Sequence, residues 1–221
     1  MRTAVVNGKL ITPHRILEGA SLVIEDGKIT GIVRDARPGA DRYLDAEGNY
    51  VSPGFIDLHT HGGGGHDFMD GTPEAIMEGC RAHLVHGTTG ICPTTLTCPD
   101  QELFTFFECY RQAKARMEQG PKLLGIHLEG PYFSMEQRGA QDPRYLKVPA
   151  QDDYEALLGA SEDIVRMSVA PELAGAMELA GALKARGILP SIGHSDATYE
   201  TVAEAWEHGY THVTHLYSGM S

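Results

Sequence analysis

The sequence lacks paired cysteines and long apolar runs. Its four cysteines form no C-x-x-C pair and lie in or beside apolar segments, at Cys80, Cys92, Cys98 and Cys109. This pattern is typical of reduced, structural thiols, so we expect a cytoplasmic protein. No apolar run approaches the roughly 18 residues that span a bilayer, and the N-terminus has no long apolar segment of the kind found in secretory signals. The sequence therefore favours a protein without a membrane partner.

Basic residues are scarce relative to acidic ones. The 221 residues contain 18 Lys and Arg against 30 Asp and Glu, a formal net charge of -12. Proteins that hold nucleic acid through phosphate contacts need basic surfaces, so we expect no nucleic-acid partner. A small anionic substrate is compatible with this charge because a pocket sets its own local potential. The sequence also contains neither G-x-G-x-x-G nor G-x-x-x-x-G-K-[ST], the loops that bind nucleotide phosphates.

The N-terminal segment reads as short strands joined by tight turns. Asn7-Gly8 and Asp26-Gly27 each separate two apolar runs, and such dipeptides are strong hairpin signals. A third short run extends from Arg42 to Leu44. Strands this few and this short bury little apolar surface by themselves. We therefore expect residues 1–52 to form a small β-unit that packs on a larger one, residues 53–221.

After Pro53-Gly54, strands alternate with helices. Helix signals are clear: Thr72 is an N-cap before Pro73, and Gly87 ends the same segment. Near-continuous apolar strands separated by helices indicate a parallel sheet with helices outside. The predicted strands are Phe55–His61, Thr88–Thr95, Lys122–Glu129, Ile164–Ala170, Ile188–His194 and Thr211–Leu216. The predicted helices are 72–87, 99–118, 152–159, 173–186 and 198–208.

Polar side chains stand at or near the C-terminal ends of four predicted strands. His59 and His61 alternate along the first strand and therefore point the same way. Glu129, His194 and His215 occupy the ends of three others. A (β/α)8 TIM barrel gathers its catalytic groups at this edge, whereas a doubly wound sheet binds at one switch point. We therefore predict an α/β barrel, incomplete here with about six strands, and read the chain as the front part of a longer protein.

Four imidazoles and one carboxylate form a mixed N/O set suited to Zn, Fe, Mn or Co. The alternative is that each is a hydrogen-bonded polar residue at a strand end. Five such residues in register at one edge favour a metal site, with His59, His61, Glu129, His194 and His215 as ligands. Four glycines, residues 62–65, follow and leave room for something to approach closely.

Other polar residues near these strands receive supporting or structural roles. His127 lies one layer deeper than the strand-end ligands, so we interpret it as a support for them. His212 lies on the face of its strand that points away from the site and is read as structural. His83, on a predicted helix, is read as a surface or C-terminal cap group. Asp196 is either a catalytic carboxylate or, as we favour, part of the next helix's N-terminal cap.

Longer stretches resemble the amidohydrolase superfamily, and within it the enzymes that deacetylate N-acetylated amino-sugar phosphates. PGFIDLHTHGGGG is similar to that family's first-strand motif and GTTGICPTTLT to its second strand. HLEGPYFSMEQRGAQ is similar to its glutamate motif, with GHSDA and THLYSGM as the two histidine motifs. The similarity runs from end to end of the chain. HLEGP combined with GHSDA and THL-x-x-x-M is specific, whereas H-x-H alone fits any amidohydrolase.

The resemblance implies a barrel joined to a small β-sandwich built from both chain ends, in a homodimer. It implies Glu129, His194 and His215 as ligands of the main metal, with His59 and His61 at the positions that hold a second ion in two-metal members. One or two divalent ions, zinc or else iron, manganese or cobalt, would then activate water. The expected reaction is hydrolysis of the acetamide of N-acetylglucosamine 6-phosphate to acetate and glucosamine 6-phosphate, a step of amino-sugar catabolism.

The same resemblance implies substrate contacts at Ala140 and Gln141, after the third strand, and at Ser218 and Gly219, after the sixth. Histidine is usual where Gln141 stands, and asparagine where Ser218 stands. A glutamine amide donates a hydrogen bond but neither carries charge nor shuttles a proton. A related N-acetyl sugar is therefore an alternative substrate.

The family's catalytic aspartate, on a later strand, is expected beyond Ser221, as are the basic groups that bind phosphate. We therefore expect this chain to bind metal and to turn over poorly or not at all. One alternative is a cyclic-amide hydrolase or deaminase of the same superfamily, although the fourth strand has no lysine of the kind that many two-metal members carbamylate. The other is a metal-binding protein without enzymatic activity.

Overall fold

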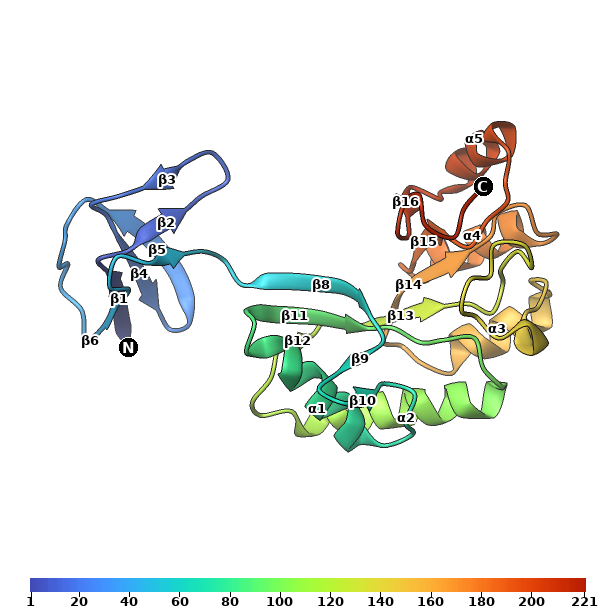
Figure 1. Cartoon of the computed structure of the whole chain (residues 1–221), viewed down its shortest axis with the longest axis horizontal. Helices are drawn as coiled ribbons and strands as arrows, with labels where there is room; N and C mark the ends of the chain where they lie inside the picture. Colours follow the sequence, from blue (N-terminus) through green and yellow to red (C-terminus); the bar gives the residue numbers. More distant parts are fainter. The chain divides into compact units, whose positions relative to one another are not determined.

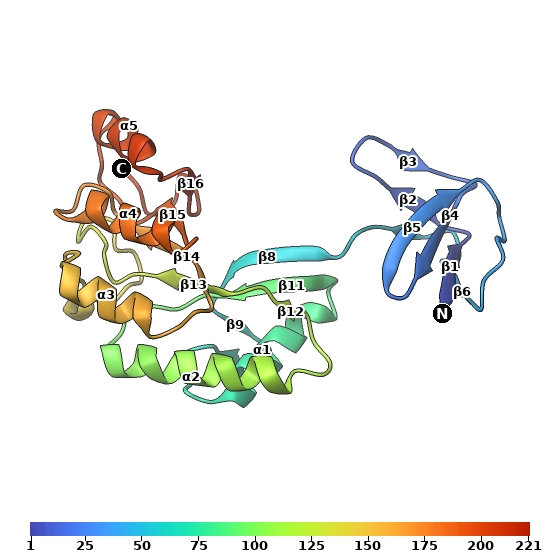
Figure 2. The same ribbon diagram turned by 180° about the vertical axis from the view of Figure 1, so that it is seen from behind.

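Two units, Met1–Gly54 and Phe55–Ser221, make up the chain in the computed structural model, which describes residues 1 to 221. Figure 1 shows the elements of each unit, and Figure 2 shows them from behind. No helix combines the length and the apolar character that crossing a bilayer requires.

The first unit consists of two small sheets. Its buried apolar side chains are few: Ala4, Leu10, Ala20 and Val23. The core of this unit is therefore thin, as its short strands predict. The larger sheet contains β1 (Arg2–Val6), β4 (Ser21–Glu25), β5 (Lys28–Val33) and β6 (Arg42–Asp45), in the order β5-β4-β1-β6; the smaller contains β2 (Lys9–Ile11), β3 (Ile16–Leu17) and β7 (Tyr50–Val51), in the order β3-β2-β7.

One of the two predicted hairpins forms and the other does not. Strands β4 and β5 pair antiparallel around Asp26 and Gly27, both with positive φ, so that prediction is confirmed. The prediction at Asn7-Gly8 is wrong, because β1 and β2 belong to different sheets. Asn7 instead bonds Asp45 through its side-chain amide at 3.1 Å. A Cβ on Gly8 would lie 2.7 Å from Val51, so this dipeptide makes a tight corner between the sheets.

Parallel strands run through the second unit in sequence order. They are β8 (Phe55–Thr60), β11 (Thr88–Pro93) and β12 (Lys122–Leu123) in one sheet, and β13 (Ile126–Glu129), β14 (Ile164–Val169), β15 (Leu189–Ile192) and β16 (His212–Val213) in the other. All these pairings are parallel, as predicted. The barrel expectation holds only in part, because two partial sheets are present and no closed barrel. A short antiparallel pair, β9 (Gly62–Gly63) with β10 (His66–Asp67), follows β8.

The strand predicted at Lys122–Glu129 is split in two by a close approach. Gly125 has φ +145°, and a Cβ there would lie 2.3 Å from the side chain of Val165. On either side of the break the backbone changes partner: Leu124 N donates to Ile91 O at 2.9 Å, whereas Ile126 N donates to Asp163 O at 2.8 Å. The split marks the seam between the two sheets, which a single parallel bridge from Thr94 to His127 crosses.

The five predicted helices are present with small changes at their ends. Thr72 and Thr198 act as N-caps through their side-chain oxygens. The helix expected from Leu173 begins later, after Gly175 in the left-handed conformation. The helices are α1 (Pro73–Leu84), α2 (Asp100–Arg116), α3 (Gln151–Gly159), α4 (Ala176–Ala185) and α5 (Tyr199–His208), with a short 3-10 turn at Pro143–Tyr145.

The apolar core of the second unit lies between the helices and one face of the strands. Helices α1 and α2 lie side by side along the first sheet (Figures 1 and 2), and α4 packs on β15 between α3 and α5. Fully buried members include Ile76, Phe106, Met167 and Leu179. The opposite strand face carries buried polar side chains, among them His127 and Arg166. The fold therefore separates an apolar layer under the helices from a polar interior.

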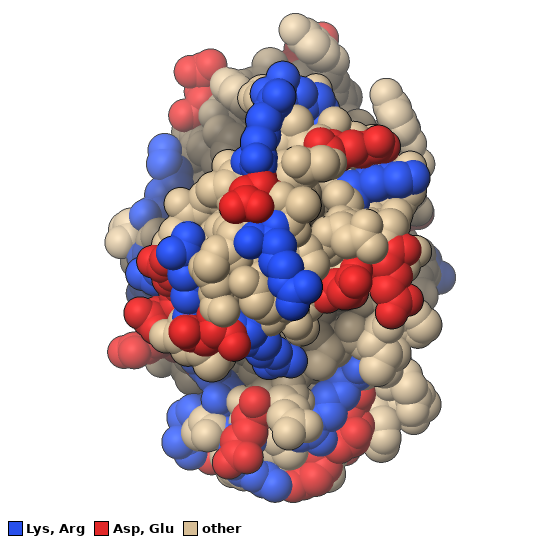
Figure 3. Space-filling view, turned by 90° about the vertical axis from the view of Figure 1, so that its left-hand side faces the viewer, with Lys and Arg blue, Asp and Glu red and all other residues tan.

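Charged surface side chains pair at short range. On α1, Arg81 reaches Glu78 at 2.5 Å, and on α2, Arg111 reaches Glu108 at 2.5 Å. Figure 3 shows one face of the molecule, where basic and acidic side chains are intermixed. Exposed pairs of this kind contribute roughly 0–1 kcal/mol each, so they affect solubility more than they stabilise the fold.

Candidate metal site

Five side chains converge that lie at or just beyond the C-terminal ends of four separate strands. They form two overlapping groups with ligand atoms within 4.8 Å of one another: His59, His61 and Glu129 in one, and Glu129, His194 and His215 in the other. These are the five residues that the sequence selects as metal ligands. Glu129 is 2% exposed and belongs to both groups, so it lies at the centre of the cluster.

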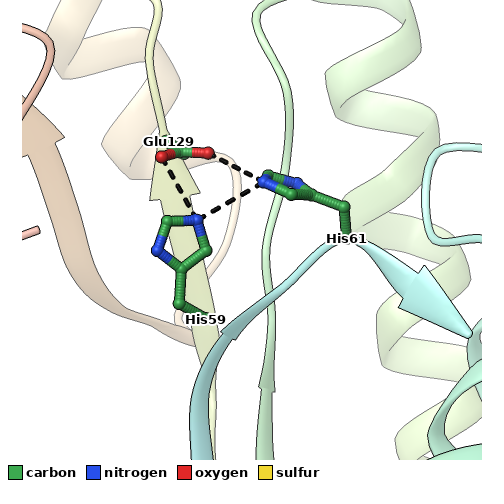
Figure 4. A group of neighbouring side chains, drawn as sticks. All are labelled: His59, His61 and Glu129. Atoms are coloured by element: carbon green, nitrogen blue, oxygen red, sulfur yellow. Dashed lines mark hydrogen bonds and ion pairs between the residues drawn. The ribbon is translucent and has the colours of Figure 1, made fainter. Parts of the chain in front are cut away.

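The first group connects β8 to β13. His59 Nε2 lies 3.2 Å from Glu129 Oε1, and His61 Nε2 lies 3.0 Å from Glu129 Oε2. The two ring nitrogens are themselves 3.4 Å apart. Figure 4 shows both rings pointing at the two ends of the same carboxylate. The alternation of the two histidines along the chain therefore produces the expected shared direction.

The second group lies within the β13–β16 sheet and its loops. His194 Nε2 and His215 Nε2 lie 3.3 and 3.2 Å from Glu129 Oε1, and 3.2 Å from each other. Both histidines follow the ends of their strands and adopt positive φ, 51° and 29°. Such conformations are costly for non-glycine residues and are found preferentially at functional sites. The ring of Phe133 covers His194 at a centroid distance of 4.3 Å.

Backbone carbonyls fix the orientation of three of the rings. His194 Nδ1 lies 2.9 Å from Gln137 O, and His215 Nδ1 lies 2.6 Å from Ser218 O. His61 Nδ1 lies 3.3 Å from Thr94 O. A carbonyl oxygen only accepts, so each Nδ1 carries the proton and donates it. In the neutral rings the Nε2 lone pairs then face the carboxylate and one another.

The cluster attracts positive charge. Burial alone raises the pKa of Glu129, but hydrogen bonds from the surrounding imidazoles, which donate through Nε2 when the rings are protonated, outweigh it and hold that pKa below its ordinary value. The hydrogen bond to Glu129 raises the pKa of His215. Burial lowers the pKa of His61, yet the interaction with Glu129 outweighs it and leaves this pKa raised. Protons or a cation would both relieve the repulsion among the Nε2 lone pairs.

The donor set fits a divalent cation. Ligands at the usual zinc distance of about 2.0–2.1 Å in a tetrahedral arrangement stand about 3.3–3.4 Å apart. The Nε2–Nε2 distances of 3.4 and 3.2 Å agree with this spacing. Metal-binding histidines also usually donate their other ring N–H to a carbonyl or carboxylate, as His194 and His215 do here.

The residues expected to contact the substrate differ in how exposed they are. Gln141 is buried, and its Oε1 accepts from Thr97 N at 2.7 Å while its Nε2 faces Glu129 Oε2 at 3.4 Å. Because the backbone N–H must face an oxygen, the amide orientation is fixed. Ala140 and Ser218 are exposed. Gly219 has φ +63°, and a Cβ there would lie 3.2 Å from His194 Nδ1.

The glycines after His61 make room for helix α1. A Cβ on Gly63 would lie 2.9 Å from His83 Nε2, and one on Gly64 would lie 3.0 Å from Ala82. His83 Nε2 lies 2.9 Å from Gly62 O. The interpretation of His83 as a surface or cap group is therefore wrong, because its ring holds the loop that carries His61. The helical position of His83 gives no signal of this contact, which spans 21 residues of sequence.

Two further interpretations of polar residues are corrected. Asp196 does not cap α5, because Thr198 does; its carboxylate instead accepts from Gln137 Nε2 at 3.2 Å. His212 faces the polar interior, where its Nδ1 lies 2.8 Å from Ser191 Oγ. Sequence reasoning also missed Arg166, an interior residue 7% exposed whose type alone would place it on the surface.

The chain belongs to the amidohydrolase family. The profile described as Amidohydrolase family matches residues 50–221, which include all five clustered side chains. The α/β fold of the second unit agrees with this assignment. N-acetylglucosamine-6-phosphate deacetylase from Danio rerio is 33% identical over 227 residues, covering 99% of this chain and 56% of that protein.

Other relatives share the same region. N-acetylgalactosamine-6-phosphate deacetylase from Escherichia coli O157:H7 is 31% identical over 214 residues, covering 96% of this chain and 56% of that protein. The crystal structure of N-acetylglucosamine-6-phosphate deacetylase from Pasteurella multocida superposes with a TM-score of 0.90 at 30% identity, over 99% of this chain and 57% of that one. The chain thus spans just over half the length of these relatives.

Proposed function

We propose that this chain contributes the metal site of a deacetylase that acts on N-acetylglucosamine 6-phosphate. The products would be acetate and glucosamine 6-phosphate. The single observation that carries the proposal is the convergence of four imidazole Nε2 atoms on the buried carboxylate of Glu129. The names of the relatives support a hydrolase of this substrate class over a metal-binding protein without activity.

Glu129, His194 and His215 would hold the main ion, and His59 and His61 with Glu129 a second one. A bound divalent cation would supply Lewis-acid activation of water and of the amide carbonyl. Imidazole nitrogens with a carboxylate suit zinc, with iron, manganese and cobalt as further candidates. Phe133 and the carbonyl partners of the rings would keep the site rigid, because they leave three of the four rings one orientation.

Substrate would approach from the loops after β13 and β16. We place its contacts at Ala140, Gln141, Ser218 and Gly219. Gln141 presents an N–H toward Glu129, so it can also donate a hydrogen bond to a substrate oxygen beside that carboxylate. The relative named for N-acetylgalactosamine 6-phosphate makes the epimeric sugar phosphate the second candidate substrate.

The fold, the location and the oligomeric state are further parts of this proposal. We propose that the parallel strands belong to a (β/α)8 barrel, because they follow one another in order and gather polar side chains at their C-terminal ends. The first unit would form a β-sandwich part. The apolar surroundings of the four cysteines support a cytoplasmic location, and the family resemblance supports a homodimer.

Acetate release from both sugar phosphates tests the activity. The chain is loaded with Zn²⁺ and assayed beside Glu129→Gln, which keeps the side-chain volume and removes the charge. The chain alone is expected to turn over slowly, so zinc affinity is measured beside the rate. Any zinc-dependent release by the wild type should exceed that of the variant by about 100-fold or more, the range seen when an essential electrostatic group is removed. Equal, measurable rates in the two proteins, or a wild type that binds no zinc, would contradict the proposal.

A further inference from the structure

Arg166 is a buried cation that crosses the polar interior beneath the metal site. It projects from β14 and is 7% exposed. Its Nη2 donates to Leu58 O at 2.6 Å and lies 2.7 Å from His127 Nδ1. No carboxylate forms an ion pair with it, and its Nε has no hydrogen-bond partner. A buried charge without a direct ion pair is costly, so its retention calls for an explanation.

The contact with Leu58 joins strands that share no backbone ladder. Strand β8 pairs with β11, whereas β14 pairs with β13 and β15. Leu58 directly precedes His59 on β8, which is the edge strand of its sheet. Arg166 therefore links the strand that carries the first histidine pair to the sheet that carries the rest of the site.

The contact with His127 determines which ring nitrogen is protonated. An arginine side chain has donors and no acceptor, so His127 Nδ1 must accept from Arg166 and cannot carry a proton. The proton of the neutral ring is then on Nε2, which lies 2.7 Å from Ser168 Oγ. Burial and the charge of Arg166 lower the pKa of His127, consistent with a neutral ring.

A chain of three hydroxyls continues from this ring. Ser168 Oγ lies 2.6 Å from Thr214 Oγ1, which lies 2.6 Å from Ser191 Oγ. Ser191 Oγ lies 2.8 Å from His212 Nδ1. Each hydroxyl donates one proton, so a donation from His127 into the first sets the direction of the rest. The last hydroxyl then donates to His212, which also holds its proton on Nε2.

We propose that Arg166 is a positioning residue: it fixes the tautomer of His127 and ties Leu58 to β14, so that His59 is held in register with Glu129. The ring of His127 stands edge-on to that of His59 at 4.7 Å between centroids, so a fixed His127 restricts His59 directly. This inference rests on the metal site proposed above. Its structural part, the tautomer, is measurable without any metal.

The first test is the tautomer of His127 in the metal-free chain, read from two-bond 15N–1H correlations of the histidine rings. We expect the Nε2–H form for both His127 and His212 in the wild type. In Arg166→Met, which keeps much of the side-chain length, His127 should lose this single form. A wild-type His127 protonated on Nδ1 would overturn the proposal without any variant.

The second test is Zn²⁺ affinity by chelator competition. Residues behind metal ligands typically change affinity about 10–100-fold when removed, and we expect such a loss at the weaker of two zinc sites in Arg166→Met. Arg166→Lys should recover most of it, because both bonds come from one nitrogen and an ammonium also has several donors. If Arg166→Met does not fold, the tautomer of His127 in the wild type still tests the proposal.

Arg81→Met is the matched control. Arg81 Nε also donates to a backbone carbonyl of a distant segment, Gln119 O at 2.8 Å, but Arg81 belongs to neither group of clustered ligands. It should leave zinc affinity and the His127 tautomer unchanged. An Arg166→Met protein that matches this control in both readouts would overturn the inference. A wild type that binds no zinc but shows the expected tautomer would reject the metal site alone.

Discussion

The contact between the glycines after His61 and helix α1 yields a prediction about Gly63→Ala. The new methyl group should clash with the ring of His83, and removal of that ring should relieve the clash. Gly63 does not have a positive φ, so alanine there meets no backbone strain. Its new Cβ would instead lie 2.9 Å from His83 Nε2 and 3.2 Å from Gly79 O. Real Cβ atoms essentially never come within 3.0 Å of another heavy atom. The ring of His83 must therefore move and lose its 2.9 Å contact with Gly62 O.

The expected cost of Gly63→Ala follows from these two effects. Inserting a methyl group into a packed contact costs about 1–3 kcal/mol, and losing a hydrogen bond costs about 0.5–1.5 kcal/mol. The smaller conformational entropy of alanine in the unfolded chain offsets roughly 0.5–1 kcal/mol. We therefore expect the free energy of unfolding, measured by urea denaturation of the metal-free chain, to fall by about 2 kcal/mol.

A double-mutant cycle tests whether His83 is the residue that the new methyl group displaces. In a His83→Ala background the ring is absent, so Gly63→Ala should cost at least about 1 kcal/mol less than in the wild type. Gly159→Ala in α3 is the control, because its Cβ would meet nothing within 4 Å; it should be neutral or stabilising by up to about 1 kcal/mol. If Gly63→Ala costs the same in both backgrounds, the packing argument is refuted.

Two further predictions concern the site itself. The raised pKa values of His61 and His215 mean that protons compete with metal for these rings. Zinc affinity, measured by chelator competition between about pH 5.5 and 8, should therefore fall as the pH decreases below these pKa values. In the metal-free chain the same ion pairs stabilise the fold below the unfolded pKa of about 6.5, and this stabilisation is lost as the pH rises through the folded pKa values. An affinity that is flat over this range would contradict this. Gln141→Ala leaves the buried N–H of Thr97 without its acceptor and should lower the free energy of unfolding by about 1–3 kcal/mol in urea; an unchanged stability would mean that Gln141 serves substrate alone.

The features that the sequence predicts well are local. The N-cap threonines, Thr72 and Thr198, set helix starts through hydrogen bonds that span three residues. The Asp26-Gly27 turn likewise follows from the conformational preferences of two residues. Asn7-Gly8 has the same local signal but lies where the chain passes between sheets. Local chemistry predicts a turn there and cannot predict which strands it joins.

The clustering of the five side chains was predictable because strand ends meet at one edge, whereas the contacts of His83 and Arg166 behind them were not. Counting alternate positions places His212 and His215 on opposite strand faces, but β16 ends at Val213 and His215 turns with φ 29°. The alternation no longer applies beyond that point, so both rings face inward. The roles of His83 and Arg166 depend on contacts across 21 and 108 residues of sequence, which no periodicity encodes.

Glu129 is at the position from which one carboxylate reaches both histidine pairs. It ends β13, the strand that begins immediately after the split at Gly125, and therefore lies at the seam between the two sheets. Its Oε1 faces His194 and His215, which a single sheet and two backbone carbonyls hold in place. The opposite pair depends instead on the position of edge strand β8 across the seam. We expect an ion bound by Glu129, His194 and His215 to be held more tightly than one bound by His59, His61 and Glu129, because the second set depends on the contacts that cross the seam.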